Sequence, residues 1–121
     1  MPSQTFSRRQ RVADQLGREM AMLLLTELND PRTQGITLSG VDLSADMRVA
    51  TIHITAPGES DIPEILKVLA NASGFLRHCL ARKVNLRHLP KLEFRYDASL
   101  DRSDRIAQLL KSAANPDSYG T

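Results

Sequence analysis

Basic side chains concentrate in one stretch of this chain, and phosphate binding is the chemistry that they could perform. Between Phe75 and Tyr96 the sequence holds six basic residues and one acidic residue, Glu93. The basic residues are Arg77, Arg82, Lys83, Arg87, Lys91 and Arg95. Arginine and lysine donate charge-assisted hydrogen bonds to phosphate oxygens, and a basic cluster is the electrostatic footprint of nucleic-acid binding. A solvated charged face without a ligand is the alternative interpretation.

The charge of the chain is unevenly distributed. The 121 residues carry a formal net charge of only +2. Between Glu27 and Lys67, seven acidic residues stand against three basic ones. The sequence therefore predicts a molecule with an acidic part and a basic part, and the basic part would attract a polyanion.

A run of small residues, Ala72-Ser73-Gly74, lies directly before the basic cluster and predicts a break between two helices. The run could be no more than a helix end, because glycine favours the position after a helix. Alternatively, Ser73 and Gly74 present backbone N–H groups and the positive start of the next helix to a phosphate. We expect Gly74 to hold a geometry that alanine adopts poorly, either a positive φ or a close helix approach.

The reactive side chains do not form a catalytic constellation. His78 and Cys79 are neighbours, and neighbours on a helix point about 100° apart, so they make no nucleophile–base pair. Cys79 also falls at a core-facing position of the expected helix. The three histidines lack a metal-ligand spacing, and Asp42 and Asp46 flank a turn, where carboxylates serve turn chemistry. We therefore expect no enzyme activity, no metal, no cofactor and no small-molecule substrate.

The composition indicates where the protein acts and which contacts it makes. The single cysteine excludes an intrachain disulfide. No apolar run approaches the ~20 residues that cross a bilayer, and the polar N-terminus does not resemble a secretory signal. Three Phe, two Tyr and no Trp leave few platforms for stacking nucleobases. We expect a cytoplasmic monomer that does not contact membranes.

Hydrophobic periodicity predicts the elements that position the basic residues. A capping box at Ser7–Gln10 begins a first helix, which ends before Pro31. Two strands follow, at Ile36–Leu43, with a bulge at Gly40, and at Val49–Ala56. The first helix has an apolar stripe of Val12, Leu16, Met20, Leu23, Leu24 and Leu28.

A second capping box begins at Asp61 and starts the first of two helices, which the small-residue run separates. Residues 91–96 alternate between apolar and charged side chains and predict a third strand. A last helix follows Ser99, with an apolar face of Ile106, Leu109, Leu110 and Ala113. The order α-β-β-α-α-β-α predicts a two-layer α+β domain with a three-stranded mixed sheet and helices on one face. We expect this domain over residues 8–114, with flexible ends at 1–7 and 115–121.

Three segments of the chain resemble the ribosome-binding factor A family. Ser39–Met47 resembles the family's first hairpin, Ala72-Ser73-Gly74 its Ala-x-Gly kink, and Leu86–Ser99 its Pro-x-Leu-x-Phe-x-Tyr-Asp-x-Ser run. Asp30-Pro31-Arg32 also fits. The resemblance covers roughly residues 8–110, and the third segment is the most specific.

The resemblance implies a type II KH-like fold and a non-enzymatic role in ribosome assembly. The partner would be the free or immature small (30S) subunit, and the role would be to assist late maturation and processing of its 16S rRNA. Neither this chain nor the family has the Gly-x-x-Gly loop with which ordinary KH domains clamp four nucleotides. A small α+β interaction or regulatory domain, with a basic face that meets an acidic protein, is the alternative function.

Overall fold

The computed structural model of the protein describes residues 7–98. The helix α2 (Arg8–Thr26) leads through the 3-10 turn η1 (Pro31–Thr33) to the strands β1 (Thr37–Leu43) and β2 (Val49–Thr55). The helix α3 (Ile62–Ala81) and the strand β3 (Lys91–Tyr96) complete the fold. The predicted last helix lies outside the described residues.

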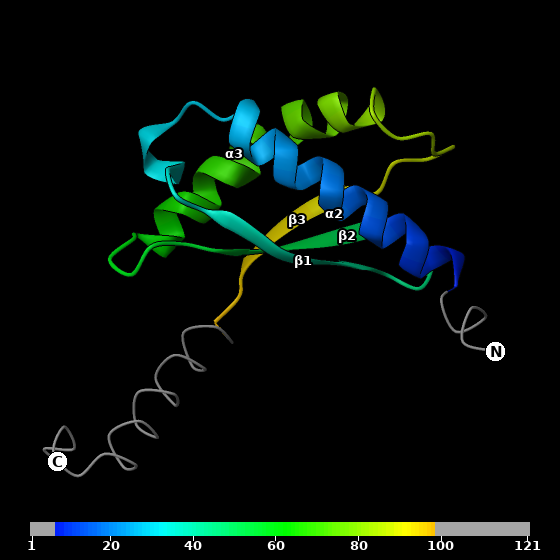
Figure 1. Ribbon diagram of the computed structural model, residues 1–121, viewed down its shortest axis with the longest axis horizontal. Coiled ribbons are helices and arrows are strands. Elements are labelled where there is room, and N and C mark those ends of the chain that lie inside the picture. The colour runs from blue at the N-terminus through cyan, green and yellow to red at the C-terminus, as the bar shows by residue number, and fades with distance from the viewer. Residues whose placement is uncertain (1–6, 99–121) are drawn as a thin grey trace, which may run out of the picture.

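The three strands form one mixed sheet in the order β1-β2-β3. β1 and β2 are antiparallel with a register shift between Leu38 and Gly40, so the predicted bulge is confirmed. β2 and β3 are parallel, because a helix connects them. Both helices cover the same face of the sheet (Figure 1), and the two-layer α+β prediction is confirmed.

Each helix begins as its sequence predicts. The Ser7 side chain caps α2 by accepting from the Gln10 backbone N–H at 3.3 Å. Asp61 caps α3 by accepting from the Glu64 N–H at 3.1 Å. The apolar faces of both helices then pack on Ala50, Ile52 and Ile54 of β2, which are fully buried. This core fixes which residues remain at the ends and outer surfaces of the helices.

The predicted break between two helices does not occur. α3 runs without interruption from Ile62 to Ala81 and includes the whole small-residue run, although its ribbon changes direction along its length (Figure 1). Gly74 lacks a positive φ, and a Cβ atom built on it would meet nothing within 4 Å. The expectation of a geometry that alanine adopts poorly was therefore wrong. A single glycine costs a helix only about 1 kcal/mol, which the packing of Leu69, Leu76 and Leu80 outweighs.

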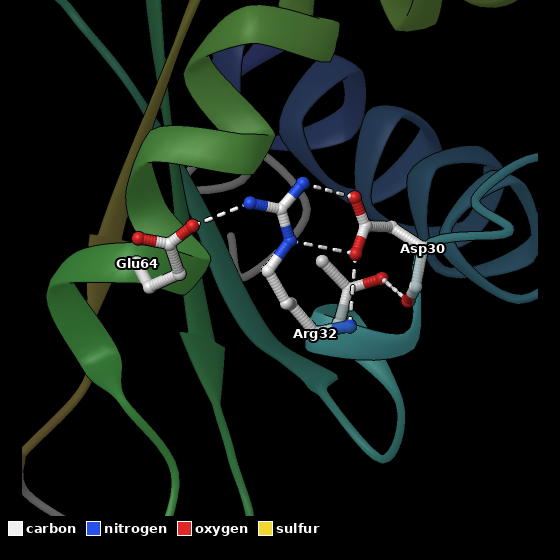
Figure 2. Close-up of polar contacts among 4 residues, drawn as sticks. Asp30, Arg32 and Glu64 are labelled. Atoms are coloured by element: carbon white, nitrogen blue, oxygen red, sulfur yellow. Dashed lines mark hydrogen bonds and ion pairs between the residues drawn. The ribbon is translucent and has the colours of Figure 1, made fainter.

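A three-residue ion-pair network ties η1 to the start of α3 (Figure 2). The Arg32 guanidinium group donates to both carboxylate oxygens of Asp30, at 2.9 and 2.6 Å, and also to Glu64. The Arg32 backbone N–H donates to the same Asp30 side chain at 2.9 Å. These hydrogen bonds lower the pKa of the Asp30 carboxyl from 3.8 to about 2. The network explains why Asp30-Pro31-Arg32 occurs as a unit: it shapes η1 and orients α3.

Candidate nucleic-acid interface

A basic groove of about 830 Å³ lies where four elements meet at one end of the molecule. In Figure 1 the start of α2, the β1–β2 turn and the loop before β3 all approach the right-hand side. The residues that line the groove are Arg8, Asp46, Met47, Arg48, Arg77, Leu86, Arg87, His88, Leu89 and Lys91. Five of them are basic and one is acidic. The surplus positive charge suits a polyanion such as the phosphate backbone of RNA.

The acidic residue of the groove is already engaged in the β1–β2 turn. An Asp46 carboxylate oxygen accepts from the Ser44 hydroxyl at 2.7 Å and from the Arg48 backbone N–H at 3.0 Å. Ser44 and Arg48 thereby lower the pKa of the Asp46 carboxyl. Met47 has a φ of 61°, a left-handed conformation that closes the tight turn. The turn thus holds Arg48 at the rim, and the lowered pKa keeps Asp46 ionised, so its carboxylate offsets part of the positive charge of the groove.

Arg77 anchors the loop that forms the far wall of the groove. Its Nε donates to the carbonyl oxygen of Pro90 at 3.1 Å, and its Nη2 donates to that of Leu89 at 2.8 Å. The Lys91 N–H donates to the Arg48 carbonyl at 2.8 Å and joins this loop to β2. A guanidinium group has five N–H donors, so Arg77 keeps donors for a phosphate as well.

A smaller hollow of about 320 Å³ continues the groove along α3. It is lined by Ser73, Gly74, Arg77, Lys91 and Leu92. The Ser73 hydroxyl donates to the Ala70 carbonyl at 2.8 Å, an ordinary contact within a helix. Ser73 and Gly74 do not form a helix start, but the missing Gly74 side chain leaves the α3 backbone open to close approach from outside.

The structure divides the remaining predicted cations between two other places. Arg82 and Lys83 line a separate hollow between α2 and α3 and do not reach the groove. Arg95 lies on β3, on the sheet face away from the helices, where it is 3.8 Å from Glu93. The predicted basic set therefore contributes Arg77, Arg87 and Lys91 to the groove.

Sequence reasoning missed two residues of the groove, Arg8 and Arg48. Arg8 is the first residue of α2, and Arg48 lies in the stretch that is acidic overall. Neither is near the basic cluster in sequence. The parallel pairing of β2 with β3 brings Arg48 to Lys91, and the packing of α2 against β1 brings Arg8 to the same end of the sheet. The one available signal was the turn that Asp42 and Asp46 flank, which places Arg48 directly before the strand predicted at Val49–Ala56.

Residues 7–98 contain no group of three or more His, Cys, Asp or Glu side chains that could hold a metal ion. In the same part of the chain, no helix is long and apolar enough to cross a membrane.

A three-stranded mixed sheet, covered on one face by two helices and bearing a basic groove at one end, defines a two-layer α+β domain of the type II KH-like class. The chain belongs to the ribosome-binding factor A family, because a sequence model of that family matches residues 8–110. Ribosome-binding factor A of Chromohalobacter salexigens is 46% identical over 115 residues, which cover 93% of this chain and 88% of that protein. The protein of the same name from Nitrosococcus oceani is 44% identical over 119 residues, which cover 98% and 94%.

Solved structures give the same family. The crystal structure of ribosome-binding factor A from Thermus thermophilus matches with a TM-score of 0.67 and 34% identity, over 73% of this chain and 93% of that one. A homology model of the Thermus thermophilus protein, fitted into the cryo-electron microscopy map of a 30S–RbfA complex, matches with a TM-score of 0.63 over the same shares.

Proposed function

We propose that this protein is a ribosome assembly factor that binds the free or immature 30S subunit and assists late maturation and processing of 16S rRNA. The observation that carries the proposal is the basic groove, where Arg8, Arg48, Arg77, Arg87 and Lys91 converge from separate parts of the sequence. The fit of a relative from Thermus thermophilus into a 30S complex supports the same partner. The protein would act in the cytoplasm as a monomer.

The mechanism is positional and involves no reaction. Contacts to phosphates fix the register and orientation of an RNA without specifying its sequence. The groove would hold one arrangement of the RNA backbone, and RNA shape would supply selectivity. A protein that biases an RNA conformation by differential binding matters most in the cold, because misfolded RNA escapes more slowly as temperature falls.

The test is complementation of a bacterium that lacks its own factor of this family. The expected result is that the protein sediments with free small subunits in a sucrose gradient, is absent from polysomes, and restores processing of precursor 16S rRNA at low temperature. Equal binding to polysomes and free subunits, without rescue, would contradict the proposal. Nuclease treatment of a pull-down separates RNA contact from binding to an acidic protein.

A charge-matched pair of variants ties that result to the groove. Arg48→Ala with Arg87→Ala removes two groove cations. Arg18→Ala with Lys67→Ala removes two exposed cations that line neither the groove nor its extension. We expect only the first pair to lose subunit binding and rescue. Equal loss of subunit binding and rescue in both pairs would mean that net charge, and not the groove, accounts for binding.

A further inference from the structure

A second hollow, of about 560 Å³, lies between the C-terminal parts of α2 and α3. It is lined by Leu23, Glu27, Phe75, His78, Cys79, Arg82 and Lys83. It shares no residue with the basic groove or with its extension along α3. The two surfaces therefore use different flanks of α3, and one ligand could occupy both.

Phe75 is the exposed aromatic ring of the described residues. It is 51% exposed, whereas Phe94 and Tyr96 are half-buried and Phe94 packs against the core. Helical spacing places Phe75, His78 and Arg82 along one stripe of α3, at positions i, i+3 and i+7. An aromatic ring, an imidazole and a guanidinium group therefore follow one another over the hollow.

The basic residues of the hollow have a structural explanation that does not extend to Phe75. Arg82 and Lys83 follow the end of α3, where cations offset the negative end of the helix dipole. This accounts for their charge without a ligand. It does not account for an aromatic side chain that leaves half of its surface in water, next to an apolar floor of Leu23 and Cys79.

We propose that this hollow binds one unpaired nucleotide of the RNA, with its base stacked on Phe75 and its phosphate held by Arg82 and Lys83. The inference rests on the proposed RNA contact and adds a site to it. Base–aromatic stacking with nearby cations is how proteins bind single strands without reading a particular base. In the described residues, Arg82 and Lys83 form no ion pair, so their charge is available to a phosphate.

The two surfaces would then have different roles. The groove holds RNA backbone of any pairing state, whereas the hollow accepts a base only where the RNA is unpaired. A protein with both features would favour an RNA conformation in which one nucleotide is extruded. The Glu27 carboxylate on the rim would repel the phosphate, and this repulsion limits the affinity of the hollow for a nucleotide.

The primary test uses the full chain and a single-stranded oligoribonucleotide that contains the fluorescent base 2-aminopurine. The control ligand is the same sequence in a duplex. Stacking on an aromatic ring quenches this fluorophore. We expect quenching with the single strand, and we expect Phe75→Ala to abolish quenching and weaken that binding on the order of tenfold. Phe75→Tyr keeps an aromatic ring and should retain both the quenching and the affinity for the single strand. Duplex binding should stay unchanged in either variant.

Leu25→Ala is the matched control, because Leu25 is 72% exposed and lies outside the hollow. It should bind both ligands as the unchanged protein does. Arg82→Ala should reduce the slope of log affinity against log salt for the single strand, while Phe75→Ala, which removes no charge, should leave the slope unchanged. Glu27→Gln should tighten binding roughly twofold.

Cys79 supplies an independent readout, because it is the only thiol of the chain and lines the hollow. Its alkylation by N-ethylmaleimide should slow when the single strand is bound and not when the duplex is bound. Unchanged quenching and affinity in Phe75→Ala would overturn the proposal. So would protection of Cys79 by an acidic peptide but not by RNA, since the partner would then be a protein.

These outcomes separate the two proposals. If the unchanged protein binds neither the single strand nor the duplex, the proposed function fails together with the nucleotide site. If it binds RNA with a salt slope that depends on Arg48 and Arg87, but Phe75→Ala changes neither the quenching nor the affinity for the single strand, only the nucleotide site fails.

Discussion

Arg77 donates from Nη2 to the backbone carbonyl of Leu89 at 2.8 Å and so joins α3 to a loop twelve residues further along the chain. That loop carries Arg87 and leads into Lys91, which both line the basic groove. Arg77 therefore lines the groove and also holds its far wall in position.

Replacing Arg77 should affect stability as well as RNA binding. Arg77→Ala removes hydrogen bonds to two carbonyl groups and should lower the free energy of unfolding by about 1–2 kcal/mol. Arg87→Ala, which removes an exposed loop cation, should change it by no more than ~0.5 kcal/mol. Urea unfolding of both variants measures the difference. Equal stability of the two variants would leave Arg77 as a groove cation without an anchoring role.

Arg8 and Arg48 should contribute to RNA affinity although the basic cluster of the sequence does not include them. If each contacts one phosphate, Arg8→Ala with Arg48→Ala should reduce the slope of log affinity against log salt by about 0.7–0.9 for each lost contact. The slope is measured by titrating RNA at several salt concentrations. The variant pair Arg18→Ala with Lys67→Ala is the control, and an equal change in that pair would contradict the assignment.

Most of the fold could be predicted because each helix and strand has a signal within its own segment of the sequence. Ser7 and Asp61 cap the helices that they precede, and the alternation of Ala50, Ile52 and Ile54 matches a strand buried on one face. The bulge at Gly40 followed from the change of phase in the apolar pattern. Each of these signals lies within a few residues of the feature that it predicts.

The groove could be predicted only in part, because proximity in sequence is a poor guide to proximity in space. Arg82 and Arg87 are five residues apart, yet they line different surfaces. Arg8 and Lys91 are distant in sequence and line the same groove. The prediction of a break at Gly74 was wrong for a related reason. Local propensity favoured a helix end there, but tertiary packing of the residues on both sides stabilises one continuous helix.

Cys79 should be dispensable for function. It is half-buried beside Leu23 and Phe75, so Cys79→Ala should cost ~1 kcal/mol of packing energy or less. The variant should still sediment with small subunits and restore precursor processing. Complete loss of function in a stably folded Cys79→Ala protein would point to a chemical role for the thiol.

The Asp30–Arg32 pair should make stability depend on acid pH. The Arg32 hydrogen bonds lower the pKa of Asp30 to about 2, compared with 3.8 for the ordinary carboxyl. Because the folded pKa is depressed, the stabilising contribution is complete above about pH 4 and is lost as pH falls toward 2. Asp30→Asn keeps a capping oxygen for the Arg32 N–H but removes the charge.

Thermal unfolding of the unchanged protein and of Asp30→Asn from pH 6 to about pH 2 isolates this contribution. The difference in Tm should be constant above about pH 4 and should shrink below it. Raising the salt concentration should narrow the gap at neutral pH, since the Arg32 side chain is exposed and the Asp30 side chain is partly exposed. A gap that stays the same at every pH would mean that Asp30 acts only through its cap.

Two glycines should respond in opposite ways to alanine. Gly35 has a φ of +82°, and a Cβ atom there would lie 2.7 Å from Cγ of Pro57, so Gly35→Ala should destabilise the protein by about 1–3 kcal/mol. Gly74 lies within α3 with open space around it, so Gly74→Ala should stabilise the protein by up to ~1 kcal/mol. Because Gly74 lines the hollow beside Arg77 and Lys91, the added methyl group should also weaken RNA binding. Urea unfolding and RNA titration of the same samples test both effects, and a more stable Gly74→Ala protein with unchanged RNA affinity would remove Gly74 from the interface.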